Sequence, residues 1–86
     1  MLEKYYKELA AIYDHLIKKR EGADISTLSK ELTIDEETLK GDIKYLKDGG
    51  YIEAKILFGQ KAGTIADVRI TGITAEGRDI IEEKQK

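Results

Sequence analysis

The spacing of hydrophobic residues changes at Gly49-Gly50, and this change limits the possible folds more than any other feature of the sequence. Before the glycine pair, hydrophobic residues recur every three or four positions, as they do along one face of a helix. After it they take every second position from Ile52 to Phe58, as on one face of a strand. A chain of 86 residues is long enough for one domain. The sequence therefore predicts an α+β fold, with residues 1–86 as a single domain and the helices preceding a β-hairpin.

The first predicted helix covers residues 2–20 and carries an unusually wide apolar stripe. At 100° per residue its large apolar side chains fall within an arc of about 140°, more than one packing seam needs. One part of the stripe could therefore face the core while another part faces a partner molecule. Gly22 is expected to stop the helix after the cations at its end. The residues of the stripe are Leu2, Tyr5, Tyr6, Leu9, Ile12, Tyr13, Leu16 and Ile17.

Two shorter helices are predicted next, separated by a tight turn. The first covers residues 26–32, with Asp24 or Ser26 as its cap. The second covers residues 35–48, is capped by Asp35 and ends at the glycine pair. Its buried row is predicted to be Leu39, Ile43 and Leu46.

The remaining chain is predicted to form a hairpin and one more helix. Two strands within residues 51–70 flank a loop at 59–63. Tyr51 is expected to seal the base of this hairpin. Thr74 can cap a last helix over residues 75–84, which needs a docking partner because short helices are marginal in water.

The residue types argue against catalysis and against a bound metal or cofactor. The chain has no cysteine and one histidine, His15, which we place on the solvent side of the first helix. None of the 17 acidic residues lies in a stretch apolar enough to raise its pKa for acid-base work. Gly59 and Gly63 flank a hairpin loop and do not lead into a helix, so no phosphate-binding loop is expected. No apolar run approaches the length of a membrane span, and we expect a cytoplasmic protein that is not an enzyme.

The segment from Asp24 to Ile52 resembles the helix-turn-helix of winged-helix DNA-binding domains. The shared features are the inward residues of both helices, Ile34 in the turn and the exit at Gly50-Tyr51-Ile52. The stretch from Val68 to Arg78 is similar to the junction between the wing and the last helix in small winged-helix proteins, including prophage proteins of the YjcQ-like sort. The resemblance implies a winged helix-turn-helix with a three-helix core, a hairpin wing and a C-terminal helix.

The resemblance also implies a DNA-binding surface. The helix at 35–48 would be the recognition helix in the major groove, and the loop at 59–63 would be the tip of the wing. The chain is then expected to be a small transcriptional regulator of duplex DNA. The implied contact residues are Glu37, Thr38, Lys40, Gly41, Lys44, Tyr45, Lys47, Lys55, Gln60 and Lys61.

A homodimer is expected because a single copy offers few phosphate contacts. Pairing through the first and last helices would place two recognition helices about 34 Å apart, in successive major grooves. The residues expected at this interface are Leu2, Tyr5, Tyr6, Leu9, Tyr13, Ile80 and Ile81.

Several residues have a second, structural interpretation. The helix at 35–48 lacks Arg, Asn and Gln, the commonest readers of guanine and adenine. Its first-turn carboxylates also suit the helix dipole, and its lysines could lie on a solvated face. Residues 22–50 hold four lysines and seven carboxylates, a net charge of −3. The alternative function is therefore a winged-helix module that binds another protein and not DNA.

Overall fold

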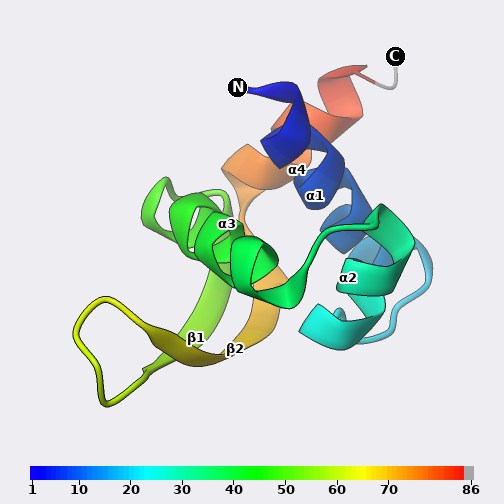
Figure 1. The fold of residues 1–86 in the computed structure, drawn as a ribbon. Helices are drawn as coiled ribbons and strands as arrows, with labels where there is room; N and C mark the ends of the chain where they lie inside the picture. Colours follow the sequence, from blue (N-terminus) through cyan, green and yellow to red (C-terminus); the bar gives the residue numbers. More distant parts are fainter. Residues whose placement is uncertain (85–86) are drawn as a thin grey trace.

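The computed structural model describes residues 1–84 and has the predicted α+β order. Figure 1 shows α3 above the hairpin, α1 and α4 beyond α3, and the hairpin loop projecting away from the helices. Every helix in the described part of the chain is too short or too polar to cross a membrane. The elements are α1 (Glu3–Tyr13), η1 (Asp14–Lys18), α2 (Ile25–Leu32), α3 (Glu36–Asp48), β1 (Ile52–Phe58), β2 (Ile65–Ile73) and α4 (Ala75–Lys84).

The first helix changes its winding before it ends. After Tyr13 the α-helix continues as the π-helical turn η1, in which the Lys19 N–H donates to the Asp14 carbonyl at 2.9 Å. Arg20 then takes a left-handed φ of 55°. The chain therefore leaves the helix before Gly22, and the predicted stop at this glycine is wrong. The predicted range 2–20 contains two helix types.

The caps of α2 and α3 come from aspartate side chains. Of the two predicted candidates for α2, Asp24 is the cap, accepting from the Thr27 N–H at 2.8 Å. Asp35 accepts from the Thr38 N–H at 3.4 Å at the start of α3, as predicted. Thr33 between the helices has a left-handed φ of 56°, which makes the turn tight.

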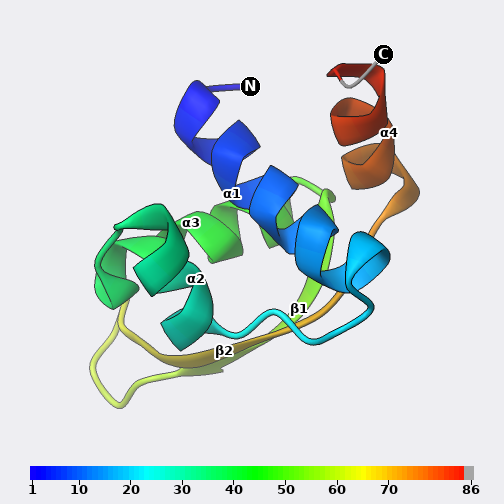
Figure 2. The ribbon, with the colours of Figure 1, turned by 90° about the vertical axis from the view of Figure 1, so that its right-hand side faces the viewer.

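The hairpin is longer than predicted, because β2 continues to Ile73. The strands are antiparallel, with Ile52 opposite Ile73 and Lys55 opposite Arg69. The register shifts between Glu53 and Ala54 and again between Leu57 and Phe58. These irregularities bend and twist the ribbon, which curves under α3 in Figure 2.

A joint of hydrogen bonds connects the hairpin to α4. Thr74 caps α4 as predicted, because its Oγ1 accepts from the Gly77 N–H at 3.1 Å. The same hydroxyl donates to the Gly50 carbonyl at 2.7 Å, and the Thr74 N–H donates to the Tyr51 carbonyl at 3.1 Å. Gly77 packs so closely on Tyr51 that a Cβ there would overlap the Tyr51 carbonyl oxygen. Tyr51 packs against the core at the base of the hairpin.

The core lies between α1, α3 and the inner face of the hairpin, with α2 and α4 closing its sides. Its centre is fully buried and includes the whole predicted row of α3. The buried apolar side chains are Leu9, Ile12, Tyr13, Ala23, Ile25, Leu28, Leu39, Ile43, Leu46, Ile52, Ala54, Val68, Ile70 and Ile81.

The predicted solvent position of His15 is wrong. The ring is buried, and its Nε2–H donates to the Glu31 carboxylate at 2.9 Å. Its Nδ1 lies 3.5 Å from a Glu21 carboxylate oxygen. The prediction failed because Glu31 of α2 and Glu21 of the loop after η1 contact the side of the helix that the sequence pattern leaves polar.

Candidate nucleic-acid interface

Around Gly41 the outer side of α3 is not covered by any other part of residues 1–84. A Cβ built on Gly41 would meet nothing within 4 Å. This side is therefore open to a partner. The predicted contact residues exposed on it are Glu37, Thr38, Gly41, Tyr45 and Lys47.

Two of the predicted phosphate-binding lysines on α3 are engaged within the chain. The Lys40 ammonium donates to Glu37 Oε1 at 3.4 Å and to the Ala66 carbonyl at 3.3 Å, and its side chain is only 15% exposed. The Lys44 ammonium donates to Asp48 Oδ2 at 2.6 Å. This hydrogen bond lowers the pKa of Asp48, so the carboxylate stays charged beside the lysine. Both lysines are less available to a phosphate than their positions on the helix predict.

Tyr45 is predicted to contact DNA, but one face of its ring is already covered. It stacks on Tyr5 of α1, with the ring centroids 4.2 Å apart and the planes at 16°. The Lys4 ammonium lies 4.8 Å from the Tyr5 ring centroid. Tyr45 remains 53% exposed, so the part of the ring that Tyr5 does not cover can still meet a partner.

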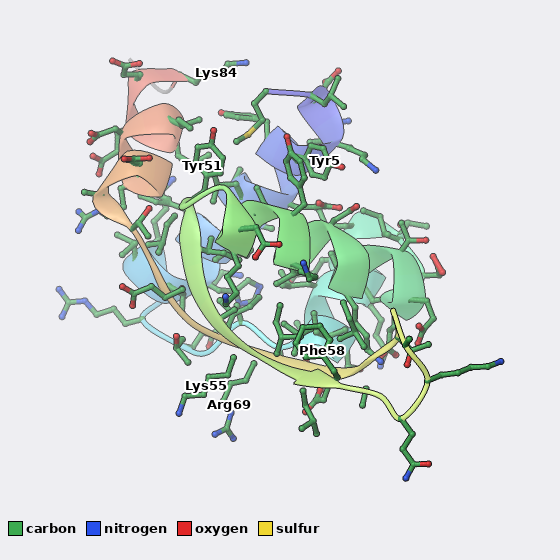
Figure 3. The ribbon with its side chains drawn as sticks, turned by 90° about the vertical axis from the view of Figure 1, so that its left-hand side faces the viewer. Tyr5, Tyr51, Lys55, Phe58, Arg69 and Lys84 are labelled. Carbon is green, nitrogen blue, oxygen red and sulfur yellow. The ribbon has the colours of Figure 1, made fainter. Side chains whose placement is uncertain are left out.

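The hairpin carries a pair of neighbouring cations on its outer face. Lys55 and Arg69 are directly opposite each other across the two strands, and both are exposed. Figure 3 shows their side chains close together and pointing away from the helices. Neither forms an ion pair with any residue in the described range 1–84. Like charges directly opposite in a ribbon repel each other, and a bound anion relieves this repulsion.

Arg69 was missed in the sequence analysis, although a signal for it was present. The alternation of β2 places Val68 and Ile70 inward, and therefore places Arg69 outward. The exposed loop residues Gln60 and Lys61 extend the polar surface of the hairpin to its tip. Phe58 is 60% exposed beside them, and Leu57 is equally open. The hairpin thus offers cations and apolar surface together.

An open groove lies between the start of α2 and β2. Its volume is about 660 Å³, and its lining includes Asp24, Glu36, Asp67 and Arg69. Three carboxylates against one guanidinium repel phosphate. The groove is therefore not part of the candidate interface, although Arg69 borders both.

The residues predicted for a dimer interface fall into two groups. Leu9, Tyr13 and Ile81 are buried in the core of their own chain, so their side chains form no surface. The Tyr13 hydroxyl donates to Glu82 at 2.9 Å. The accessible members are Leu2, Tyr5, Tyr6 and Ile80, and the Lys84 ammonium covers Tyr6 at 4.5 Å from the ring centroid.

A core of α1, α2 and α3 packed on a two-stranded antiparallel hairpin and followed by α4, with a helix-turn-helix at α2 and α3, is a winged-helix fold. Among solved structures the chain is similar to FabT of Streptococcus pneumoniae, whose crystal structure was determined in complex with DNA, with a TM-score of 0.65 and 19% sequence identity. The alignment covers 99% of this chain and 52% of the FabT chain, so this chain spans about half the length of FabT. No protein-family model and no curated protein matches the sequence. At this identity the likeness to FabT establishes the fold alone.

Proposed function

We propose that the chain is a DNA-binding winged-helix domain that regulates transcription. The single observation that carries this proposal is the uncovered outer side of α3 next to a hairpin whose cations have no counterion within the described residues. FabT supports it, because a chain with this fold has been crystallised with DNA. In this proposal α3 enters the major groove, and Lys55, Arg69 and Lys61 contact phosphates.

The proposal includes a homodimer that needs no metal or cofactor, has no catalytic activity and acts in the cytoplasm. The accessible residues Leu2, Tyr6 and Ile80 are its interface in this proposal, with α1 and α4 of each copy paired. Two copies double the number of phosphate contacts and so raise the affinity through effective concentration. The similarity to YjcQ-like prophage proteins stays a prediction from the sequence.

Salt-titrated binding to mixed-sequence duplex DNA tests the proposal. The double variant Lys55→Gln/Arg69→Gln removes two phosphate contacts from each copy, so the slope of log K against log salt becomes shallower by about 1.8 per copy, or about 3.6 for the bound dimer. The matched control is Lys18→Gln/Arg20→Gln, which removes one exposed lysine and one exposed arginine outside α1, α3, α4 and the hairpin and should leave the slope unchanged. Equal slopes for the two double variants would rule out the hairpin as a phosphate-binding surface.

A second candidate function is a protein-binding module, and the engaged lysines of α3 favour it. Lys40 and Lys44 are both paired with carboxylates, and residues 22–50 are net acidic. This candidate predicts no detectable duplex binding even at low salt, where nonspecific affinity is highest. The same titration therefore separates the two functions.

A further inference from the structure

Two carboxyl groups from different helices meet in the interior between α1 and α3. Glu8 of α1 is 0% exposed and Asp42 of α3 is 7% exposed. Both carboxyl oxygens of Glu8 and the Oδ2 of Asp42 are buried without a hydrogen-bond partner if both groups are ionised. Burying an unpaired charge costs far more than burying a neutral hydrogen-bonded group. Two ionised carboxylates are therefore a poor description of this contact.

One cation is available for the pair. The Lys4 ammonium donates to Asp42 Oδ1 at 3.3 Å, and this hydrogen bond raises the pKa of Lys4. Within residues 1–84, Asp42 from α3 and Lys4 from α1 itself are the charges that act on Glu8, and α2 and α4 contribute none. The single ammonium of Lys4 balances only one of the two carboxylates. If Glu8 and Asp42 were both ionised, the three groups would keep a net charge of −1.

We propose that Glu8 and Asp42 hold one proton between them at neutral pH, and that this proton positions α3 against α1. Glu8 carries the proton and its O–H donates to Asp42 Oδ2, while Lys4 holds Asp42 Oδ1. One proton thus gives two of the three unpartnered oxygens a hydrogen bond. Asp42 and Tyr45 lie on one side of α3, and Lys4, Tyr5 and Glu8 meet them from α1.

The electrostatics of the site agree with this assignment. Burial raises the pKa of Glu8 most strongly, the hydrogen bond with Asp42 and its charge add to the rise, and Lys4 opposes it. The result is a pKa of about 8, compared with 4.5 for an unperturbed glutamate. Between these two pH values the folded chain binds a proton that the unfolded chain has lost. The free energy of unfolding therefore falls as the pH rises from 4.5 to 8. Above pH 8, Glu8 is ionised in both the folded and the unfolded state and has no further effect on stability.

The variant Glu8→Gln tests the proton directly, because its amide mimics the protonated acid. Between pH 5 and 8 the unfolding equilibrium constant of the wild type should rise about tenfold per pH unit relative to this variant. The variant should be the more stable protein at pH 8. The matched control is Glu3→Gln on the exposed side of the same helix, which should show no such difference over this range. A wild type and a Glu8→Gln variant with parallel pH profiles would overturn the proposal.

Carbon NMR of the Glu8 carboxyl gives a second measurement that needs no variant. We expect a titration midpoint near 8 in the wild type and a lower one in Asp42→Asn, which removes the neighbouring charge. The backbone amide signals of residues 42–45 should shift with the same midpoint and should not shift in Glu8→Gln. A Glu8 midpoint near 4.5 contradicts the shared proton, and a midpoint near 8 with unmoved α3 amides contradicts its positioning role.

Discussion

The two parts of the candidate interface, α3 and the hairpin, differ in how much of their chemistry the chain itself uses. On α3, Lys40, Lys44 and Tyr45 each have an intramolecular partner. On the hairpin, Lys55 and Arg69 have none within the described residues. These side chains of α3 are therefore held by contacts within the chain, whereas the two hairpin cations are not. In the proposed function, the affinity of this mildly acidic chain for DNA then depends more on the hairpin than on the helix.

The largest expected effect tests whether α3 is packed more tightly than the outer face of the hairpin. Ile43→Ala removes a fully buried side chain and should lower the free energy of unfolding by about 2 to 5 kcal/mol. Leu57→Ala on the exposed hairpin face is the matched control and should change it by less than about 0.5 kcal/mol. Urea denaturation of both variants measures the difference. Similar losses would show that the hairpin is as tightly packed as the helix.

The next effect concerns the base of the hairpin, which is bonded to the start of α4, whereas the loop at its tip projects away from the helices. Gly77→Ala places a methyl group on the Tyr51 carbonyl oxygen and should destabilise the chain by about 1 to 3 kcal/mol. Gly41→Ala, in open space on α3, should stabilise it by up to about 1 kcal/mol. Thermal unfolding of the two variants checks the opposite signs. If a DNA backbone approaches Gly41 closely, the second variant will also bind duplex DNA more weakly.

The smallest effect tests the attachment of the exposed α3 side to α1. The stacked rings of Tyr5 and Tyr45 should show a coupling of about 0.5 to 1.5 kcal/mol in a double-mutant cycle of Tyr5→Ala and Tyr45→Ala. Chemical denaturation of the two single variants and the double variant gives the value. If the losses of unfolding free energy in the two single variants simply add up to the loss in the double variant, the two rings do not stabilise each other, and Tyr45 is not attached to α1 through Tyr5.

The sequence predicts those parts of the fold that depend on local signals. Asp35 and Thr74 cap the helices that follow them, and the predicted row of Leu39, Ile43 and Leu46 is buried. The hairpin follows from alternation after a glycine pair. In each case the information lies within a few neighbouring residues, so one sequence is enough to find it.

The parts that were missed depend on contacts between distant segments. A helical projection assigns one buried side to a helix, but α1 packs against α2, α3 and α4 together. His15 is therefore buried although the pattern places it on the solvent side, and Glu8 is buried although it is not part of the apolar stripe. The expectation that no carboxyl lies in an apolar setting failed at Glu8 for this reason. The outward position of Arg69 follows from the alternation of β2, but its pairing with Lys55 depends on the strand register of the folded hairpin.

The hydrogen bonds of Thr74 attach the base of the hairpin directly to the start of α4. Thr74 bonds to Gly50 and Tyr51 at one side and caps α4 at the other, with no flexible linker between them. A partner that binds α4 therefore contacts an element that is attached directly to the base of the hairpin.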